Sequence, residues 1–412
     1  MNSLKFLLVT LWLTSAVHAD EALRQKALQH GLKPLVEQGD RTKMGEARIV
    51  LGKKLFFDKN LSLNRDISCA SCHETVHGGA DGRSTAIGDR GQKNPSHLNT
   101  PTVLNTVFSK HYFWDGRSST LQDQAKGPLQ APFEMASSPA LIEKRLKSDR
   151  KYEKLFFQAF GDHNITFERT AEAISAYEHT LTTRGRYDRF LEGDLLALSE
   201  DEQAGLNLFI DKGCIGCHNG IGLGGQEMRK FPLLHHPIWS MTDHKTLNKV
   251  RTAYLAFLAE EGRKQNFSND IERYAYLMKS LGEKEVELLS EGYFQAYKAP
   301  DSYRIMSSKG CYICHTEPNF GVDKQILKEK AFAFKNTGGF LGKEKPGRYF
   351  RAPLLRNVVR TAPYFHNGSV KTLEEAVQIM VTYQSRSKVT EKQLTQLIAF
   401  LKAVDAPDKE SR

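Results

Sequence analysis

All six cysteines of this 412-residue chain fall into three Cys-X-X-Cys-His motifs, and no other feature limits the fold as strongly. The motifs are Cys69-Ala-Ser-Cys72-His73, Cys214-Ile-Gly-Cys217-His218 and Cys311-Tyr-Ile-Cys314-His315. At this spacing the two thiols form thioethers with the vinyl groups of haem, and the histidine binds the iron. One such motif could be a zinc half-site or a redox-active dithiol, but three motifs that use every cysteine, behind an export signal, oppose both alternatives. The sequence therefore predicts three covalently bound haem c groups.

The N-terminus predicts export. Lys5 precedes an apolar run from Phe6 to Leu13, and small residues follow at Val17 and Ala19. This order is typical of a cleavable signal peptide, here residues 1–19, and the apolar run is too short to span a bilayer. A lone membrane anchor is the alternative, which the segment length opposes. We expect a periplasmic protein whose mature chain has no transmembrane segment.

The net charge argues against one class of partner. The formal charge is +10, of which Lys5 leaves with the signal peptide. Each ferric haem adds roughly one negative charge, so the mature holoprotein is only mildly basic. The chain has no basic runs interleaved with aromatic residues, and we expect no binding to nucleic acid.

Hydrophobic spacing predicts helices and few strands. Leu394, Leu397, Ile398 and Leu401 recur at helical intervals. Capping boxes mark three helix starts, namely Ser199 with Glu202, Thr372 with Glu375, and Thr390 with Gln393. The expected helices are 46–57, 139–160, 167–182, 199–212, 246–262 and 268–281. Long Gly-rich loops separate them, because porphyrin can supply much of each core. The predicted fold class is all-α.

Several longer motifs carry a family likeness. They are LGKKLFFDKNLS (51–62), CASCH (69–73), LNTPTVLN (98–105), FWDGR (113–117), DQAKGPL (123–129), FEMAS (133–137), CHNGIGLGG (217–225) and FRAPLLRNVVRTAPYFHNGSVKTLEEAVQIM (350–380). In these segments the chain closely resembles the bacterial dihaem cytochrome c peroxidases and their MauG-like relatives. The resemblance implies tandem cytochrome c-type haem domains with long loops. We expect a peroxidatic haem domain at 20–185 and an electron-transfer haem domain at 186–412.

The resemblance implies the residues around the first haem. A peroxidase needs an open iron site, an acid–base group beside it and a path for electrons. Glu134 matches the family's distal acid, and Gln124 matches the amide that orients peroxide, with Pro128 in the same pocket segment. Trp114 matches an aromatic residue that relays electrons between two haems. From the residues alone, Glu134 is an ordinary loop carboxylate and Trp114 a core aromatic.

The chain departs from the family after the first motif. Many members carry a second histidine there, which blocks the peroxidatic iron until the enzyme is reduced. The corresponding stretch, 86–91, holds no histidine, and the flanking His77 and His97 are more simply loop residues. Our hypothesis is that the first haem is five-coordinate at rest. A low-spin, bis-histidine first haem in the isolated protein would contradict it.

The closing segment implies further ligands. Met380 matches the family's sixth ligand to the electron-transfer haem, where MauG-like oxidases use tyrosine, although Tyr383 lies nearby. From the residues alone, Met380 is core filling. The family's calcium site between the domains matches Asn99, Thr361 and Pro363, which would supply hard oxygen ligands. Plain turn chemistry is the alternative for Asn99 and Pro363. The role of His366 stays open.

The third motif lies in an apparent insertion at 235–345. Met380 could be the sixth ligand of the haem bound by His218 or of the haem bound by His315. We favour His218, because Asn219-Gly220 and Gly224-Gly225 match the residues that come after the family's second haem motif. The remaining haem would take its distal ligand from within the insertion, where the candidates are Met241, His235, His236, His244 and Met278. This haem would be an entry port for electrons, as extra haems are in quinol-linked relatives.

Together these features predict a periplasmic peroxidase that reduces hydrogen peroxide to water. Its electrons would come from a cytochrome c-like protein or the quinol pool. One alternative is a MauG-like haem oxidase that acts on a protein or small molecule; the other is a trihaem electron carrier without catalysis. Family members are often dimers, so a homodimer is a further expectation.

Overall fold

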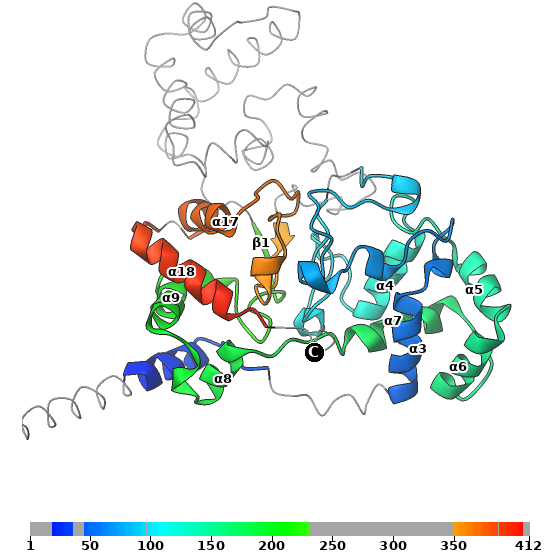
Figure 1. Cartoon of the computed structure of the whole chain (residues 1–412), viewed down its shortest axis with the longest axis horizontal. Coiled ribbons are helices and arrows are strands. Elements are labelled where there is room, and N and C mark those ends of the chain that lie inside the picture. Colours follow the sequence, from blue (N-terminus) through cyan, green and yellow to red (C-terminus); the bar gives the residue numbers. More distant parts are fainter. Residues whose placement is uncertain (1–18, 36–44, 96–97, 231–348, 386, 407–412) are drawn as a thin grey trace, which may run out of the picture.

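The computed structural model describes residues 19–35, 45–95, 98–230, 349–385 and 387–406. Figure 1 shows a mostly helical chain. Residues 19–29 are helical. They are followed by α3 (Glu46–Phe56), α4 (Leu121–Gln130), α5 (Pro139–Lys147), α6 (Arg150–Phe160), α7 (Phe167–Glu178), α8 (Arg186–Glu192), α9 (Glu200–Asp211), α17 (Leu373–Ile379) and α18 (Glu391–Ala403). Within these ranges no helix has the length and apolar character to cross a bilayer.

The prediction of an all-α class is supported by the mostly helical fold, which also contains one short antiparallel strand pair. Strand β1 (Met228–Lys230) pairs with β2 (Tyr349–Arg351), and Lys230 stands opposite Tyr349. The pairing joins residues far apart in sequence, so no local pattern announced it. Its consequence is topological: the chain enters residues 231–348 and leaves them at adjacent points. The predicted insertion at 235–345 falls inside these limits.

Most predicted helix starts are confirmed. Ser199 with Glu202 and Thr390 with Gln393 form complete capping boxes, and the Thr372 side chain accepts from the Glu375 amide. The predicted helix 139–160 is instead two helices, because the Asp149 side chain accepts from the Lys151 amide and starts α6 anew. The predicted helices 246–262 and 268–281 lie outside the described residues.

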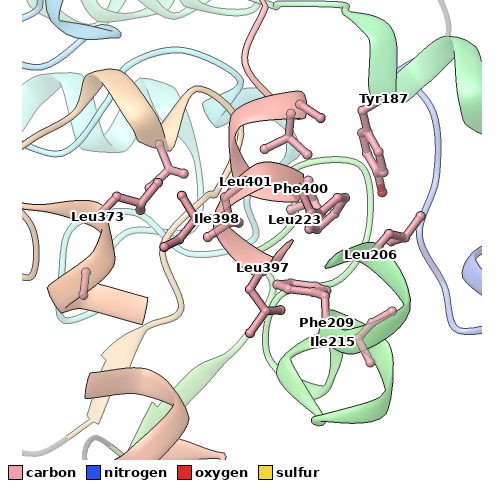
Figure 2. Close-up of a cluster of buried hydrophobic side chains, with 14 of the residues drawn as sticks. Tyr187, Leu206, Phe209, Ile215, Leu223, Leu373, Leu397, Ile398, Phe400 and Leu401 are labelled. Carbon is pink, nitrogen blue, oxygen red and sulfur yellow. The ribbon is translucent and has the colours of Figure 1, made fainter. Parts of the chain in front are cut away.

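Two hydrophobic clusters form the core. The first is built from α3 to α7, and the second from α8, α9, α17 and α18 with the intervening loops. Figure 2 shows the second cluster, in which Phe400 of α18 lies 5.2 Å from Phe209 and 5.7 Å from Tyr187 between ring centroids. Ala27 and Leu32 from the N-terminal helical segment also belong to this second cluster. The start of the described chain thus packs on the C-terminal half.

Each cluster contains the same helix crossing. A Cβ placed on Gly52 of α3 would lie 1.8 Å from the Ala173 carbonyl oxygen and 3.0 Å from the Tyr177 Cβ on α7. On Gly205 of α9 it would lie 1.9 Å from the Gln396 carbonyl oxygen and 2.8 Å from the Phe400 Cβ on α18. Only glycine allows backbones to approach so closely. The pair α3–α7 is therefore repeated as α9–α18.

A second segment is repeated at constant spacing. Asn105 and Asn357 both take the left-handed conformation, with φ 61° in each. Seven residues on, Tyr112 bridges to Ser118 in the first copy and Tyr364 to Val370 in the second. Thr120 then caps α4 and Thr372 caps α17. This register places Trp114 opposite His366 and Pro128 opposite Met380.

The two copies meet at a buried hydrogen-bond network. The Asn105 amide donates to the Thr183 hydroxyl at 2.9 Å, and that hydroxyl donates to the Asn357 side-chain oxygen at 2.8 Å. All three side chains are fully buried. Because polar groups at this depth need partners, the network fixes how the two halves face each other.

Candidate haem-binding and peroxidatic site

The first motif forms a tight turn that presents its histidine. Cys69–Ser71 is a single 3₁₀ turn, and the His73 amide donates to the Cys69 carbonyl at 3.1 Å. The His73 Nδ1 lies 2.9 Å from the Gly79 carbonyl oxygen. A backbone carbonyl at this distance holds the proton on Nδ1 and leaves Nε2 as the ligand atom. Burial lowers the pKa of His73, which favours the neutral, metal-binding form.

The second motif repeats this arrangement. Cys214–Gly216 is again a 3₁₀ turn, and the His218 Nδ1 lies 3.1 Å from the Pro353 carbonyl oxygen and 3.3 Å from that of Leu223. Pro353 precedes the second copy of the repeated segment, so His218 is oriented by the element that leads to Met380. The third motif, with Cys311, Cys314 and His315, lies outside the described residues.

The thiols of the first two motifs are unsuited to redox exchange. All four described cysteines are free. Burial raises the pKa of Cys72 to about 12 and that of Cys214 to about 11. A redox-active dithiol needs a lowered pKa, because the thiolate is the nucleophile. The two motifs instead fit the thioether role.

A buried cation also fits haem. Arg351 is 4% exposed, and its guanidinium donates to the Phe113 carbonyl at 3.2 Å and the Ser109 hydroxyl at 3.5 Å. Both acceptors are neutral, so within the described ranges this charge has no carboxylate counterpart. A buried charge needs a counter-ion, and a haem propionate is one. The residues present therefore fit two covalently bound haems.

Glu134 lies in the turn that follows α4. Its amide donates to the Ala131 carbonyl, and Met135 and Ala136 also bond back to this turn. Burial raises the pKa of Glu134 to about 7, although the nearby Arg117 guanidinium lowers it. Glu134 in turn contributes to the raised pKa of the Cys69 thiol. The carboxyl is therefore close to the first haem attachment and can exchange a proton near neutral pH.

The loop at 86–91, which lacks the family's histidine, packs on Glu134. The Asp89 amide donates to the Glu134 carbonyl at 2.7 Å, and a Cβ on Gly88 would lie 2.6 Å from the same oxygen. The Asp89 carboxylate accepts from the Asn64 amide at 3.1 Å. His77 is a half-exposed loop residue 3.9 Å from the Glu74 carboxylate. His97 lies outside the described residues.

The remaining pocket candidates come from α4 and α17. Gln124 and Pro128 both lie on α4, the helix that leads to Glu134. Met380 packs against the second cluster together with Cys214, and a π-helical turn, Met380–Gln384, begins at it. Such turns are frequent at functional sites. The repeat thus puts a side chain without a ligand atom in the first half and a methionine in the second.

Trp114 lies where the halves meet. It is 9% exposed and belongs to the second cluster, although its loop begins in the first half. Its indole N–H donates to the Asn99 carbonyl at 2.9 Å, and its ring lies 6.2 Å from that of His366. The Asn99 amide donates to the His366 carbonyl at 2.7 Å. The Asn99 contact also joins one predicted calcium ligand to the loop that carries Thr361 and Pro363.

Three polar residues of this region escaped the sequence patterns. Arg117 influences Glu134, Arg351 is the buried cation, and Glu178 is a buried carboxyl. A pattern existed for Glu178: it follows Ala171 and Ile174 at helical spacing, on the buried face of α7. Sequence reasoning could have singled out Glu178, because an acidic residue on the apolar face of a predicted helix is unusual.

Comparison with known proteins agrees with these features. A family profile for di-haem cytochrome c peroxidase matches residues 46–195, and one for RoxA-like, cytochrome c-like proteins matches 349–387. The chain is 32% identical to cytochrome c551 peroxidase of Nitrosomonas europaea, over 87% of this chain and 80% of the relative. It is 33% identical to the Pseudomonas aeruginosa protein of the same name, over 90% and 82%.

The architecture is also similar to a solved structure. A MauG-like protein associated with microbial copper homeostasis aligns with a TM-score of 0.56 and 25% identity, over 91% of this chain and 93% of that chain. The two presented histidines, the paired thiols and the family profile all agree with these relatives. The chain belongs to the dihaem cytochrome c peroxidase family.

Proposed function

We propose that this chain is a periplasmic peroxidase that reduces hydrogen peroxide to water at its first haem. The observation that carries this proposal is an asymmetry between two repeated halves. The first half has Pro128 and the buried acid–base carboxyl of Glu134 where the second half has Met380. One half can therefore admit a substrate, while the other is suited to full ligation and electron transfer.

The distal residues would move protons. The ionised Glu134 carboxylate takes a proton from one peroxide oxygen and returns it to the other, so that water departs. Gln124 holds the peroxide by its amide while this transfer occurs. His73, oriented by Gly79, would hold the first haem, which when bound supplies a redox-active iron. Overall, two electrons and two protons convert one peroxide into two waters.

The second half would deliver electrons. His218 and Met380 would hold the second haem, and Trp114 would pass electrons to the first. Its contacts with Asn99 and His366 keep the indole rigid between the halves. Calcium held by Asn99, Thr361 and Pro363 would strengthen the same junction. The proposed domain limits are 20–185 and 186–412, although Ala27 and Leu32 of the N-terminal segment pack in the second cluster.

A direct assay tests this function. The holoprotein is expected to oxidise reduced cytochrome c only when peroxide is present, and its ferric EPR spectrum to contain a high-spin species lost on peroxide addition. Wholly low-spin iron without a peroxide reaction would point to an electron carrier. Reaction with peroxide but no turnover with any cytochrome or quinol donor would favour a MauG-like oxidase.

A third haem is part of the proposal. Its support is the third Cys-X-X-Cys-His motif, in a segment whose two ends are held together by β1 and β2. Intact-protein mass spectrometry is expected to find three haems in the native chain, and two in the double variant Cys311→Ser/Cys314→Ser. The variant should keep its reaction with peroxide but lose donor-driven turnover. Two haems in the native chain would refute this part.

A further inference from the structure

The fully buried carboxyl of Glu178 has no role in the proposed reduction of peroxide. Glu178 is the last residue of α7 and only 6% exposed. Its Oε2 has no hydrogen-bond partner among the residues that the structure describes. Burial of an unpaired polar group costs free energy, so such groups in native proteins call for an explanation.

Glu178 lies next to the first haem attachment. After burial itself, the charge of Glu178 is the largest cause of the raised pKa of the Cys69 thiol. The charge of Glu178 is also the largest cause, after burial, of the raised pKa of the Tyr112 hydroxyl, which is about 12. Cys69 would be bonded to the haem, and Tyr112 opens the loop that carries Trp114. The carboxyl is therefore buried from bulk solvent and close to the first haem attachment.

The internal repeat shows that the fold does not need this carboxyl. Gly52 meets Ala173 and Tyr177 as Gly205 meets Gln396 and Phe400. The residue after Tyr177 in α7 is Glu178, and the residue after Phe400 in α18 is Leu401. Figure 2 shows Leu401 among the apolar side chains of the second cluster. The second half thus fills this place with a hydrocarbon, and the first half with an acid.

The electrostatic surroundings make Glu178 sensitive to haem charge. Burial raises the pKa of Glu178 to about 8, and no charged group on the packed helices α3 and α4 shifts it. A ferrous porphyrin core is neutral, whereas the single positive charge of a ferric core would lower the pKa of Glu178 relative to the ferrous state. Between the two pKa values, the carboxyl is ionised beside ferric haem and protonated beside ferrous haem.

We propose that Glu178 is a proton-holding residue of the first haem site, which binds one proton from solvent as one donor electron reaches that haem. The carboxylate becomes a neutral acid when the iron goes from ferric to ferrous, and the proton leaves when the iron is oxidised again. The inference goes beyond the proposed function, in which peroxide reacts with the ferric haem, and concerns the ferric–ferrous couple of that haem. Leu401, at the equivalent position in the second half, cannot bind a proton, so reduction of the second haem would not be coupled to proton binding there.

Potentiometric titration of the holoprotein between pH 6 and 9 tests this role. In the native protein the midpoint potential of the first haem should decrease with increasing pH up to about pH 8, because the carboxyl titrates in this range. The limiting slope for one proton per electron is about 59 mV per tenfold change in proton concentration. The variants Glu178→Gln and Glu178→Leu should abolish this slope, and the potential of the second haem should not change.

A matched control lies on the same helix. Glu172 is a half-exposed carboxylate of α7 paired with Arg48, and Glu172→Gln should leave the first-haem slope intact. Infrared difference spectra between the reduced and oxidised protein should show a protonated carboxyl that Glu178→Gln removes. A slope that survives in both Glu178 variants would overturn the proposal and assign the proton to another group, such as a propionate.

The same samples separate this inference from the peroxidase function. Peroxide-dependent oxidation of cytochrome c is measured independently of the potential. A native protein without turnover but with a slope lost in Glu178→Gln would refute the function and keep the proton role. Turnover in the native protein, with an unchanged slope in the Glu178 variants, would support the peroxidase function and refute the proton role of Glu178.

Discussion

Replacement of Glu134 by glutamine is expected to slow the reaction with peroxide by about 10²- to 10⁴-fold, the usual contribution of a positioned acid–base group. Glutamine keeps the shape of the side chain but cannot accept the peroxide proton. The bimolecular rate constant from stopped-flow mixing measures the effect. The haem spectrum should be unchanged, because the Ala131 and Asp89 contacts of this turn involve backbone atoms.

The pH profile gives a second measure of the same residue. Burial raises the pKa of Glu134 to about 7, and the active form is the ionised one. The rate constant should therefore rise with pH through this value in the native protein and stay flat in Glu134→Gln. Arg117→Gln should move the inflection to higher pH, because the arginine charge lowers this pKa.

An exposed carboxylate supplies the control for both measurements. Glu153 is a half-exposed residue of α6, and Glu153→Gln should leave the rate and its inflection unchanged. If Glu134→Gln reacts with peroxide as fast as the native protein, then another group moves the proton and the proposed mechanism fails.

Replacement of Asp188 by alanine is expected to cost about 3–5 kcal/mol of folding free energy, the typical result of breaking a buried ion pair. Asp188 and Arg356 lie 2.6 Å apart, and both side chains are 1% exposed. The carboxylate also accepts from the Leu35 amide at 2.7 Å and the Gly185 amide at 2.9 Å. Alanine would leave a buried guanidinium without its charge partner.

Urea unfolding of the holoprotein, followed by circular dichroism, measures this cost as a lower midpoint. Asp162 with Arg169 is the control, because its carboxylate is 53% exposed and ion pairs in contact with solvent contribute little. The double variant Asp188→Leu/Arg356→Met should recover much of the loss, since it removes both charges. A midpoint for Asp188→Ala equal to that of Asp162→Ala would contradict the importance of this pair.

Parts of the site that depend on short stretches of chain were predictable. The spacing within Cys69–His73 and Cys214–His218 is enough to assign haem attachment, and Ser199 and Thr390 mark helix starts with their own neighbours. The break between α5 and α6 was missed although it is local, because the apolar pattern continues across Asp149. There a side-chain cap outweighed hydrophobic spacing.

The relations between the halves were not predictable in this way. The repeat that sets Pro128 against Met380 is visible in the sequence, because Asn105, Tyr112 and Thr120 recur as Asn357, Tyr364 and Thr372 at a constant interval. How its two copies pack against each other is not visible there. The contact of Trp114 with His366, and the strand pair at residues 230 and 349, join segments far apart along the chain. A sequence pattern reports on neighbours and carries no such distances.

The sequence by itself determined the chemistry that this protein can carry: covalent haem at the first two Cys-X-X-Cys-His motifs, each with a histidine that can bind iron. These properties arise within five consecutive residues and need no distant partner. The tertiary structure decided how far the carboxyls of Glu134 and Glu178 lose water, although the helical spacing of α7 already placed Glu178 on its apolar face. Desolvation depends on everything packed around a group, so only the folded chain sets the protonation of these two acids.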